Sequence, residues 1–357
     1  MLQTCEPRSL NSAGWQPRSI LGIESSCDET AAAVLDSDGQ VLSNVISSQI
    51  AVHAKFGGVV PELAARAHLG TIDMVVNDAL AQAHLSKNDL GAVAVTQGPG
   101  LAGALLVGVN YAKAFSYGLG IRLIGVNHLE GHIASAWIAD PTFPLPCIIL
   151  VVSGGHTHLY RRETDGRCAL LGCTRDDAAG EAFDKGAQML GLEFPGGPAI
   201  DRLARQGNPA VISFPRFQPR KNNLEFSFSG LKTSLLYKLR DMNTPVRSEQ
   251  IAELAAGYQE AIVQVLVAKA FAALAQAGLS ALAVVGGVSA NSRLRALLKE
   301  RAEQESIRLA LPPMAYCTDN AAMIASAGRH ALLTDLQSIR DLDIQPTLHI
   351  EPIHKPA

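Results

Sequence analysis

One pattern occurs twice in this chain of 357 residues, and it restricts the fold more than any other feature. The segment ILGIESSCDETAAAVLDSDGQVLSNVI (20–46) predicts an apolar strand, a small polar turn, a second strand, a hairpin at Asp38-Gly39 and a third strand. The segment CIILVVSGGHTHLYRRETDGRCALLG (147–172) repeats this order, and its hairpin at Asp165-Gly166 follows the first by 127 positions (38 to 165). Two such units, with both turns aimed at one place, are a way to hold a phosphate from two lobes.

The segments between and after the repeats alternate in type, which indicates an α/β protein. The apolar spacing predicts strands at 92–96, 122–127 and 282–289, and helices at 60–85, 104–119, 229–242, 251–278, 291–304 and 318–333. We expect residues 195–223 to be irregular, because they are rich in Pro, Gly and Arg.

The length exceeds what one hydrophobic core holds, so we expect two lobes. The N-terminal lobe should span 20–145 and the C-terminal lobe 146–335, with an irregular insertion at about 195–247 and the last helix returning to the first lobe. Residues 1–19 read as a flexible leader and residues 336–357 as a weakly ordered tail. With 48% hydrophobic and 18% charged residues, the chain has ample material for a buried interior.

Charge and composition exclude several classes of protein. A net charge of -3 and an isoelectric point of about 6.4 do not suit general nucleic-acid binding, so any RNA site must be a local patch. The six cysteines include no C-x-x-C pair, and no long apolar run or secretory h-region is evident. We expect a soluble, cytoplasmic protein with no membrane partner; import into an organelle, suggested by Arg8 and Arg18 in the leader, is the minor alternative.

The segment NHLEGHIASAW indicates a metal site. Its spacing puts the imidazoles of His128 and His132 on one face of a helix, one turn apart, although two structural histidines would explain the pair equally well. The string resembles the zinc-protease motif H-E-x-x-H, but Glu130 lies about 200° around the helix from His128, on the face away from both ligands. This position argues against a metallopeptidase.

Asp319 is the best candidate for a third ligand, at the start of a helix after an expected Thr318 cap. A first-turn acid that complements the helix dipole is the alternative role for this residue. Two imidazoles and one carboxylate suit one divalent ion, and we favour Fe(II) over Zn(II).

Glycine turns follow several of the expected strands. GPGLAG (98–103) matches a dinucleotide-binding pattern, but the next strand ends in Asn127 and His128 rather than in an acid that would hold a ribose. VVSGGHTH and VVGGVSANSRL each place Gly-Gly directly after an apolar strand, where backbone N–H groups can approach an anion. With the SSCDE turn, they favour a nucleotide site over merely structural turns.

These segments together resemble the universal tRNA N6-adenosine threonylcarbamoyltransferase family, formerly labelled glycoproteases, and most of all its bacterial catalytic subunit (the TsaD family). The resemblance covers residues 20–332, through LGIESSCDET, GGVVPELAARAH, QGPGLAGALLVG, NHLEGHIASA, LVVSGGHTHL, GEAFDKGAQMLGL, PGGPAID, FSFSGLKT, GGVSANSRLR and CTDNAAMIA. It implies an actin/Hsp70/sugar-kinase-like fold with two ribonuclease-H-like lobes around a nucleotide cleft.

The resemblance also implies site residues. The metal ligands of the family fall on His128, His132 and Asp319. Its nucleotide-substrate contacts fall on Val151, Val152, Ser153, Gly154, Gly155, Asp184, Gly197, Asp201 and Asn291. The long leader and the insertion near residue 220 depart from the pattern, and neither includes these positions.

The implied reaction moves a threonylcarbamoyl group from threonylcarbamoyl-AMP to N6 of adenosine 37 in tRNAs that read codons beginning with adenine. Asp28 or Glu29, on the first turn, could accept the amine proton, although a carboxylate that only orders the turn is the alternative. Bacterial relatives work with a paralogous partner subunit and a small ATPase (TsaB and TsaE type), and organellar relatives work as homodimers.

Residues 215–240 hold six basic residues and one acid, Glu225, and so form a candidate tRNA patch. Its core is Arg216, Arg220, Lys221 and Lys232, and the interleaved Phe214, Phe217, Phe226 and Phe228 could stack bases or be buried. A metallopeptidase and a non-catalytic paralogue that serves as a scaffold are the competing interpretations. A sugar or acid kinase of the same fold is more distant.

Overall fold

The computed structural model describes residues 18–215, 223–242, 247–334 and 342–350, which form two compact units. Unit 1 contains the described residues of 18–48, 61–131 and 320–348, and unit 2 contains those of 49–60, 132–319 and 349–350. The boundary falls inside helix α4 (His128–Ala139), whereas the sequence placed it near residue 145. Each unit has its own sheet and hydrophobic core.

The sheet of unit 1 has the strand order β3-β2-β1-β4-β5. Three antiparallel strands come from the first repeat, and two parallel strands extend the sheet beyond β1. Their bounds are β1 (Ser19–Glu24), β2 (Glu29–Leu35), β3 (Val41–Ser48), β4 (Leu90–Gly98) and β5 (Arg122–Asn127). The expected hairpin at Asp38-Gly39 is confirmed, with Gly39 at φ 90°.

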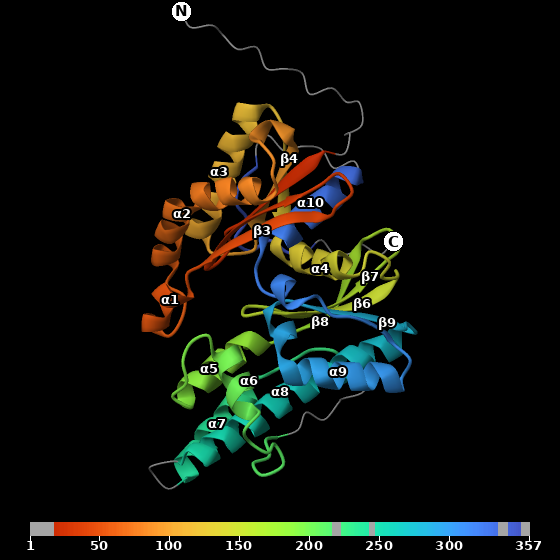
Figure 1. Ribbon diagram of the computed structural model, residues 1–357. Coiled ribbons are helices and arrows are strands. Elements are labelled where there is room, and N and C mark those ends of the chain that lie inside the picture. Colours follow the sequence, from red (N-terminus) through yellow and green to blue (C-terminus); the bar gives the residue numbers. More distant parts are fainter. Residues whose placement is uncertain (1–17, 216–222, 243–246, 335–341, 351–357) are drawn as a thin grey trace, which may run out of the picture. The chain divides into compact units, whose positions relative to one another are not determined.

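Alternation along β1 explains how helices cover both faces of this sheet (Figure 1). Leu21 and Ile23 join the core beneath α2 (Pro61–Gln82) and α3 (Ala102–Leu119). Gly22, on the opposite face, meets α10 (Ala321–Leu333), where a Cβ would lie 2.3 Å from the Ala321 carbonyl oxygen. Glycine therefore allows the last helix to pack directly on the first strand.

The sheet of unit 2 repeats the arrangement, in the order β10-β9-β6-β7-β8. The second repeat supplies the antiparallel strands, and parallel β9 and β10 extend the sheet beyond β6. The bounds are β6 (Cys147–Val152), β7 (Thr157–Arg162), β8 (Cys168–Cys173), β9 (Ala281–Val285) and β10 (Arg308–Ala310). The expected duplication is confirmed, and β10 was not predicted from the sequence.

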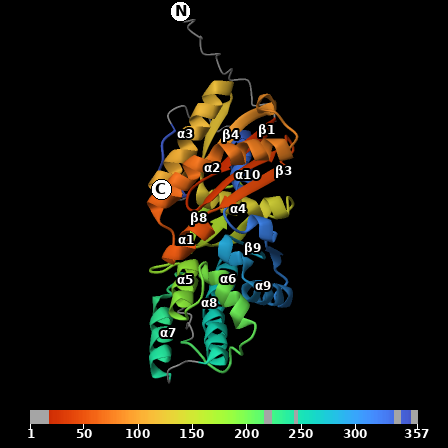
Figure 2. The ribbon, with the colours of Figure 1, turned by 60° about the vertical axis from the view of Figure 1, so that its left-hand side comes forward.

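Five of the helices in unit 2 lie together on one side of its sheet (Figure 2). They are α5 (Ala179–Met189), α6 (Gly196–Ala204), α7 (Ser229–Asp241), α8 (Ser248–Ala277) and α9 (Ser292–Gln304); the short α1 (Ile50–His53) precedes unit 2's other elements in the chain. Among the described residues, α8 alone is long and apolar enough to meet the criteria for a membrane span, but 56% of its most apolar window is buried inside the protein. Its apolar residues form the centre of the unit 2 core.

The sequence interpretation of residues 195–204 as irregular is wrong. The Pro and Gly residues there start helix α6, with Pro195 at its N-cap, instead of breaking structure. Ala199, Ile200 and Ala204 are buried at helical spacing, which secures α6 against its neighbours.

The tail is also better ordered than expected. Leu342 is 1% exposed in the unit 1 core. The backbone N–H of Gln345 donates to the Gln97 carbonyl at 2.9 Å, and that of Gly100 donates to the Pro346 carbonyl at 3.1 Å. A Cβ on Gly98 would lie 1.8 Å from the Gln345 oxygen, so the tail fills the space that glycine leaves. Residues 1–17, 335–341 and 351–357 of the leader and tail lie outside the described residues.

Candidate metal centre and nucleotide-binding turns

The two histidines of α4 are buried on one face of the helix. His128 is 5% exposed and His132 is 0% exposed, whereas Glu130 is exposed. Parallel strand β5 ends at Asn127, and the Asn127 carboxamide accepts from the Leu129 N–H at 2.9 Å, which fixes the start of the helix directly after the strand. The predicted separation of Glu130 from the two imidazoles agrees with this burial pattern.

Two residues orient the imidazole of His128: Glu24, the last residue of β1, and Ser26, in the turn between β1 and β2 (residues 25–28, the first turn). Its Nδ1 lies 3.1 Å from Glu24 Oε2 and 3.2 Å from Ser26 Oγ. Glu24 is 0% exposed and also accepts from Thr96 Oγ1. Because a carboxylate can only accept, the hydrogen is on Nδ1, and Nε2 keeps its lone pair for a metal ion. This role of Glu24 and Ser26 could not be predicted from the sequence.

Asp319 completes the group. Its Oδ1 lies 3.2 Å from His132 Nε2, and one ligand atom from each of His128, His132 and Asp319 lies within 4.8 Å of the others. Two imidazole nitrogens and one carboxylate oxygen are a donor set that fits a divalent transition metal and leaves coordination positions open. The structure therefore brings the three predicted ligands together.

Asp319 precedes its helix rather than starting it. The N-cap of α10 is Asn320, whose side-chain oxygen accepts from the Met323 N–H at 3.1 Å. The expected cap at Thr318 is wrong. Since Asn320 serves the helix end, the carboxylate of Asp319 is not needed as a cap.

A buried histidine holds the turn that carries Asp28 and Glu29. His68, on α2, is 0% exposed; its Nε2 lies 2.9 Å from the Cys27 carbonyl and its Nδ1 lies 2.8 Å from Thr30 Oγ1. A carbonyl only accepts, so Nε2 carries the hydrogen and Nδ1 accepts from the hydroxyl. The residues on either side of Asp28 and Glu29 are thereby tied to α2, a role that could not be predicted from the sequence.

The carboxylates of this turn are half-buried. Ser48 Oγ donates to Glu29 Oε1 at 2.8 Å, which ties the first residue of β2 to β3. Asp28 lies in the turn itself, between β1 and β2. The structure places both candidate proton acceptors on a well-anchored turn.

The turn between β6 and β7 (residues 153–156, the second turn) differs from the first turn because its two glycines are exposed. Val151 and Val152 are buried in β6, Ser153 is 8% exposed, and Gly154 and Gly155 are exposed. The carbonyls of Ser153 and Gly154 accept from the N–H groups of Gly180 and Glu181, so the turn is attached to the N-terminus of α5. A Cβ on Gly154 or Gly155 would meet no described atom within 4 Å, so packing within the protein does not require glycine there.

Other glycine turns have structural explanations. Gly286 has φ 91°, and a Cβ there would lie 2.4 Å from the Val152 carbonyl oxygen. In GPGLAG, a Cβ on Gly100 would lie 2.6 Å from the Ser26 carbonyl oxygen, which accepts from the Leu101 N–H. This loop packs against the turn that follows β1, which explains its glycines without dinucleotide binding.

The remaining substrate candidates lie on helix α5, on α6 and at the start of α9. Asp184 on α5 accepts from the Gly196 N–H at 2.7 Å, which links it to the beginning of α6, beside Gly197. Asp201 on α6 is 8% exposed and accepts from Ser292 and Arg205. Asn291 is the N-cap of α9 and is 8% exposed.

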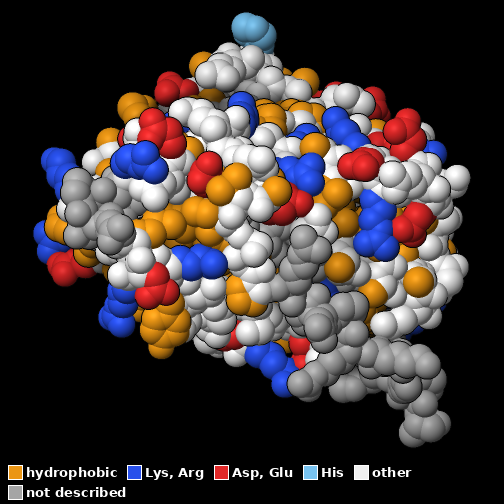
Figure 3. Space-filling view, turned by 90° about the horizontal axis from the view of Figure 1, so that it is seen from below, with side chains coloured by type: hydrophobic (Ala, Val, Ile, Leu, Met, Phe, Trp, Pro, Cys, Tyr) orange, Lys and Arg blue, Asp and Glu red, His pale blue; other side chains and the backbone are white. Residues whose placement is uncertain are grey.

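Part of the expected tRNA patch lies outside the described residues, including Arg216, Phe217, Arg220 and Lys221. Phe214, Phe226 and Phe228 are at most 6% exposed in the unit 2 core, so of the two alternatives given for these side chains, burial is confirmed and base stacking is not. On the face drawn in Figure 3, acidic side chains are interspersed among the described lysines and arginines, which form no continuous basic area there.

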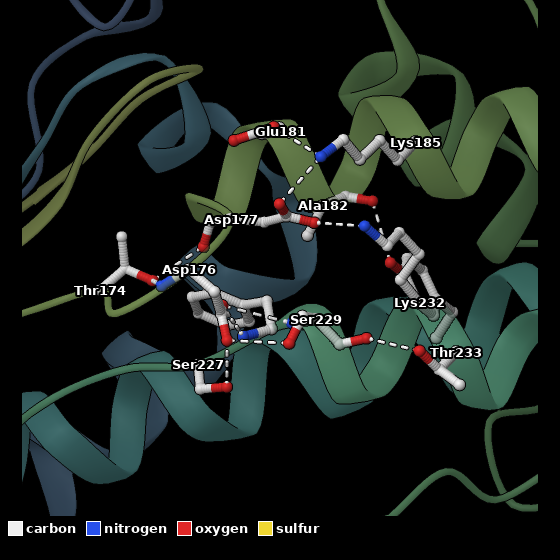
Figure 4. Close-up of polar contacts among 12 residues, drawn as sticks. Thr174, Asp176, Asp177, Glu181, Ala182, Lys185, Ser227, Ser229, Lys232 and Thr233 are labelled. Atoms are coloured by element: carbon white, nitrogen blue, oxygen red, sulfur yellow. Dashed lines mark hydrogen bonds and ion pairs between the residues drawn. The ribbon is translucent and has the colours of Figure 1, made fainter.

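Lys232, the described member of the patch core, belongs to an ion-pair network (Figure 4). Its Nζ lies 3.1 Å from Asp177, which also pairs with Lys185 at 2.8 Å. The neighbouring Asp176 accepts from the N–H groups of Phe228 and Ser229 at the start of α7. Burial acts to raise the pKa of each aspartate, but the hydrogen bonds from its partners outweigh it, so both pKa values lie below the usual range.

Two sheets with the same strand order, each half antiparallel and half parallel, define an α/β protein of the actin/Hsp70/sugar-kinase class. The crystal structure of HypF from T. kodakarensis shares the fold, with a TM-score of 0.60 at 13% identity over 90% of this chain and 48% of HypF.

Sequence comparison gives the particular family. The family model of tRNA N6-adenosine threonylcarbamoyltransferase matches residues 40–326. Enzymes of this name from Anaeromyxobacter dehalogenans (strain 2CP-1 / ATCC BAA-258) and Clostridioides difficile (strain 630) are 53% and 48% identical to this chain; each alignment covers 92% of this chain and 98% of the relative. The chain belongs to the tRNA N6-adenosine threonylcarbamoyltransferase family.

Proposed function

We propose that this chain is an acyltransferase that moves a threonylcarbamoyl group from threonylcarbamoyl-AMP to N6 of adenosine 37 in tRNAs reading codons that begin with adenine. The observation that carries the proposal is the group of His128, His132 and Asp319, with Nδ1 of His128 held by buried Glu24. A family of transferases that act on tRNA supplies the substrate class.

His128, His132 and Asp319 would hold one divalent ion, and Fe(II) suits the set better than Zn(II) because two imidazoles and a carboxylate leave several positions open. A bound ion would supply Lewis-acid chemistry suited to the oxygen atoms at the threonyl end of the donor. The protein's own part is to orient His128 through Glu24 and Ser26.

The AMP end of the donor would lie on the second turn. Gly154 and Gly155 have open space where a Cβ would be, so their backbone N–H groups can approach a phosphate closely. Asp184, Gly197, Asp201 and Asn291 belong to the helices of the same unit and would bind the nucleoside. Val151, Val152 and Ser153 are fixed in β6 and at its end and would set the position of the turn.

The reaction requires an amine to attack an acyl carbon. The N6 nitrogen forms a bond to the carbamoyl carbon, the bond from that carbon to the phosphate oxygen breaks, and AMP leaves with the electron pair. Asp28 or Glu29, on the turn that His68 anchors, would take the proton that N6 loses. Orientation of the two reactants supplies much of the acceleration.

The tRNA would contact the basic segment around Arg216, Arg220, Lys221 and Lys232. A paralogous partner subunit and a small ATPase of the TsaB and TsaE type are the proteins that we propose as partners. Because Lys232 already pairs with Asp177, we expect its contribution to tRNA affinity to be smaller than that of the three other residues.

One experiment tests the function. The purified chain, loaded with Fe(II), is incubated with threonylcarbamoyl-AMP and unmodified tRNA, and digested nucleosides are analysed by mass spectrometry. We expect threonylcarbamoyladenosine, and no product from His132→Ala. If the unaltered chain gave no product even with bacterial partner proteins added, the proposed function would be wrong.

A further inference from the structure

The carboxamide of Asn291 has one allowed orientation. Its Oδ1 lies 2.9 Å from the Leu294 N–H of α9, and its Nδ2 lies 2.7 Å from Gln259 Oε1. A backbone N–H can only donate, so the atom that faces Leu294 must be the oxygen, and the amide nitrogen must face Gln259. Nδ2 carries two hydrogens, and Gln259 uses one of them. The second remains for a ligand.

Gln259 fixes this arrangement from another helix. It lies near the middle of α8, is 5% exposed, and contacts Asn291 across 32 positions of sequence. The N-cap bond alone holds Oδ1 but leaves the amide plane able to rotate about that contact. A second bond from Gln259 prevents this rotation, because both ends of the carboxamide are then held.

We propose that Gln259 is a positioning residue for nucleotide binding: it holds Asn291 so that this residue presents an N–H donor to an acceptor atom of the AMP moiety. The inference rests on the proposed function, which assigns Asn291 to the donor site. Two points go beyond the proposed function. Gln259, on α8, acts without touching the substrate, and Asn291 is the donor, not the acceptor, in its hydrogen bond to AMP.

The structure also provides a matched control. Glu260, adjacent to Gln259, pairs with Arg293 through two bonds of 2.6 and 2.9 Å, so it joins α8 to α9 at the same level. Glu260→Gln weakens this helix contact without touching Asn291. A role of Gln259 in helix packing alone would make the two substitutions behave alike.

The test measures AMP affinity by isothermal titration calorimetry, and donor kinetics, on the metal-loaded full chain. Gln259→Met keeps the size of the side chain and removes the acceptor. We expect its Kd for AMP and its KM for threonylcarbamoyl-AMP to rise about tenfold, as loss of one oriented hydrogen bond implies, with kcat within about twofold. Glu260→Gln should leave both constants within about twofold of wild type.

Gln259→Glu keeps an oxygen that accepts from Asn291, and we expect it to retain AMP affinity within about threefold even if thermal stability falls. Equal AMP affinity in wild type and Gln259→Met, or equal losses in the Met, Glu and Glu260→Gln variants, would overturn the inference. Failure of the wild-type chain to bind AMP would instead overturn the proposed function, so the two failures are distinct.

Discussion

The two repeats fold alike, but their turns differ in how the protein holds them. Side chains lock the first turn: Glu24 accepts from Thr96, and His68 bonds to Cys27 and Thr30. The second turn is attached to α5 by backbone bonds and exposes Gly154 and Gly155. One supersecondary unit thus has two forms: in the first, Glu24 and Ser26 orient His128, which we propose as a metal ligand, and in the second the backbone of Gly154 and Gly155 stays accessible, where we propose that an anion binds.

The largest expected effect is on the free energy of unfolding, and it distinguishes a glycine that packing requires, Gly286, from one that packing does not require, Gly155. Gly286→Ala places a Cβ 2.4 Å from the Val152 oxygen at φ 91°, so we expect a loss of about 3 kcal/mol in the free energy of unfolding. Gly155→Ala should stay within about 0.5 kcal/mol of wild type and yet bind AMP more weakly. Denaturant unfolding and AMP titration measure both. Comparable destabilisation by the two substitutions would mean that the second turn is not open.

The next largest expected effect is on metal affinity, and it tests whether Glu24 orients His128. Glu24→Gln keeps the shape of the side chain and removes the charge that holds His128 Nδ1–H, so metal affinity should fall about 10- to 100-fold. Competition with a chelator measures the affinity for Fe(II) or Zn(II) directly. Glu62→Gln is the control, since Glu62 is an exposed partner of Arg66 on α2. Unchanged metal affinity in Glu24→Gln would deny the first turn its orienting role.

The smallest effect lies beyond the second repeat, in the loop that precedes α5. The pKa of Asp177 is lowered in the folded chain below its ordinary value of 3.8, so its ionised form stabilises folding above that pH and the contribution disappears as pH falls through the folded pKa. We expect Asp177→Asn to cost about 1 kcal/mol or less at pH 7, because Lys185 and Lys232 are partly exposed.

The free energy of unfolding of both proteins, measured from pH 7 to pH 3, shows whether this contribution depends on the charge of Asp177. The difference between wild type and Asp177→Asn should shrink toward the acid end. A difference that stayed constant would assign the loss to packing rather than to the carboxylate charge.

Local patterns in the sequence predicted local features well. Apolar alternation with Asp-Gly hairpins gave both three-stranded units, and i, i+4 spacing gave the face shared by His128 and His132. Thr, Asp and Asn all favour the N-cap position of a helix, and they stand in a row at 318–320. Spacing alone therefore could not identify Asn320 as the residue that caps α10.

Residues that act through distant partners were missed. Glu24 contacts His128 across 104 positions, and His68 contacts Cys27 across 41. Nothing near Glu24 or His68 in the sequence marks those partners, because tertiary packing alone brings the strand end, α2 and α4 together. The described tail was missed for the same reason, since Leu342 is buried by strands and helices encoded far upstream.

The contact of Gly22 with α10 has a consequence for synthesis. The last strand of the first sheet ends at Asn127, but the helix that covers the Gly22 face begins at Ala321, 194 positions later (127 to 321). At a translation rate of roughly 5 to 20 residues per second, this face of the sheet stays uncovered for about 10 to 40 seconds before α10 is synthesised. The nascent chain must therefore keep an apolar sheet surface from aggregating until translation is almost complete, and a chain that stops short of Ala321 cannot bury it.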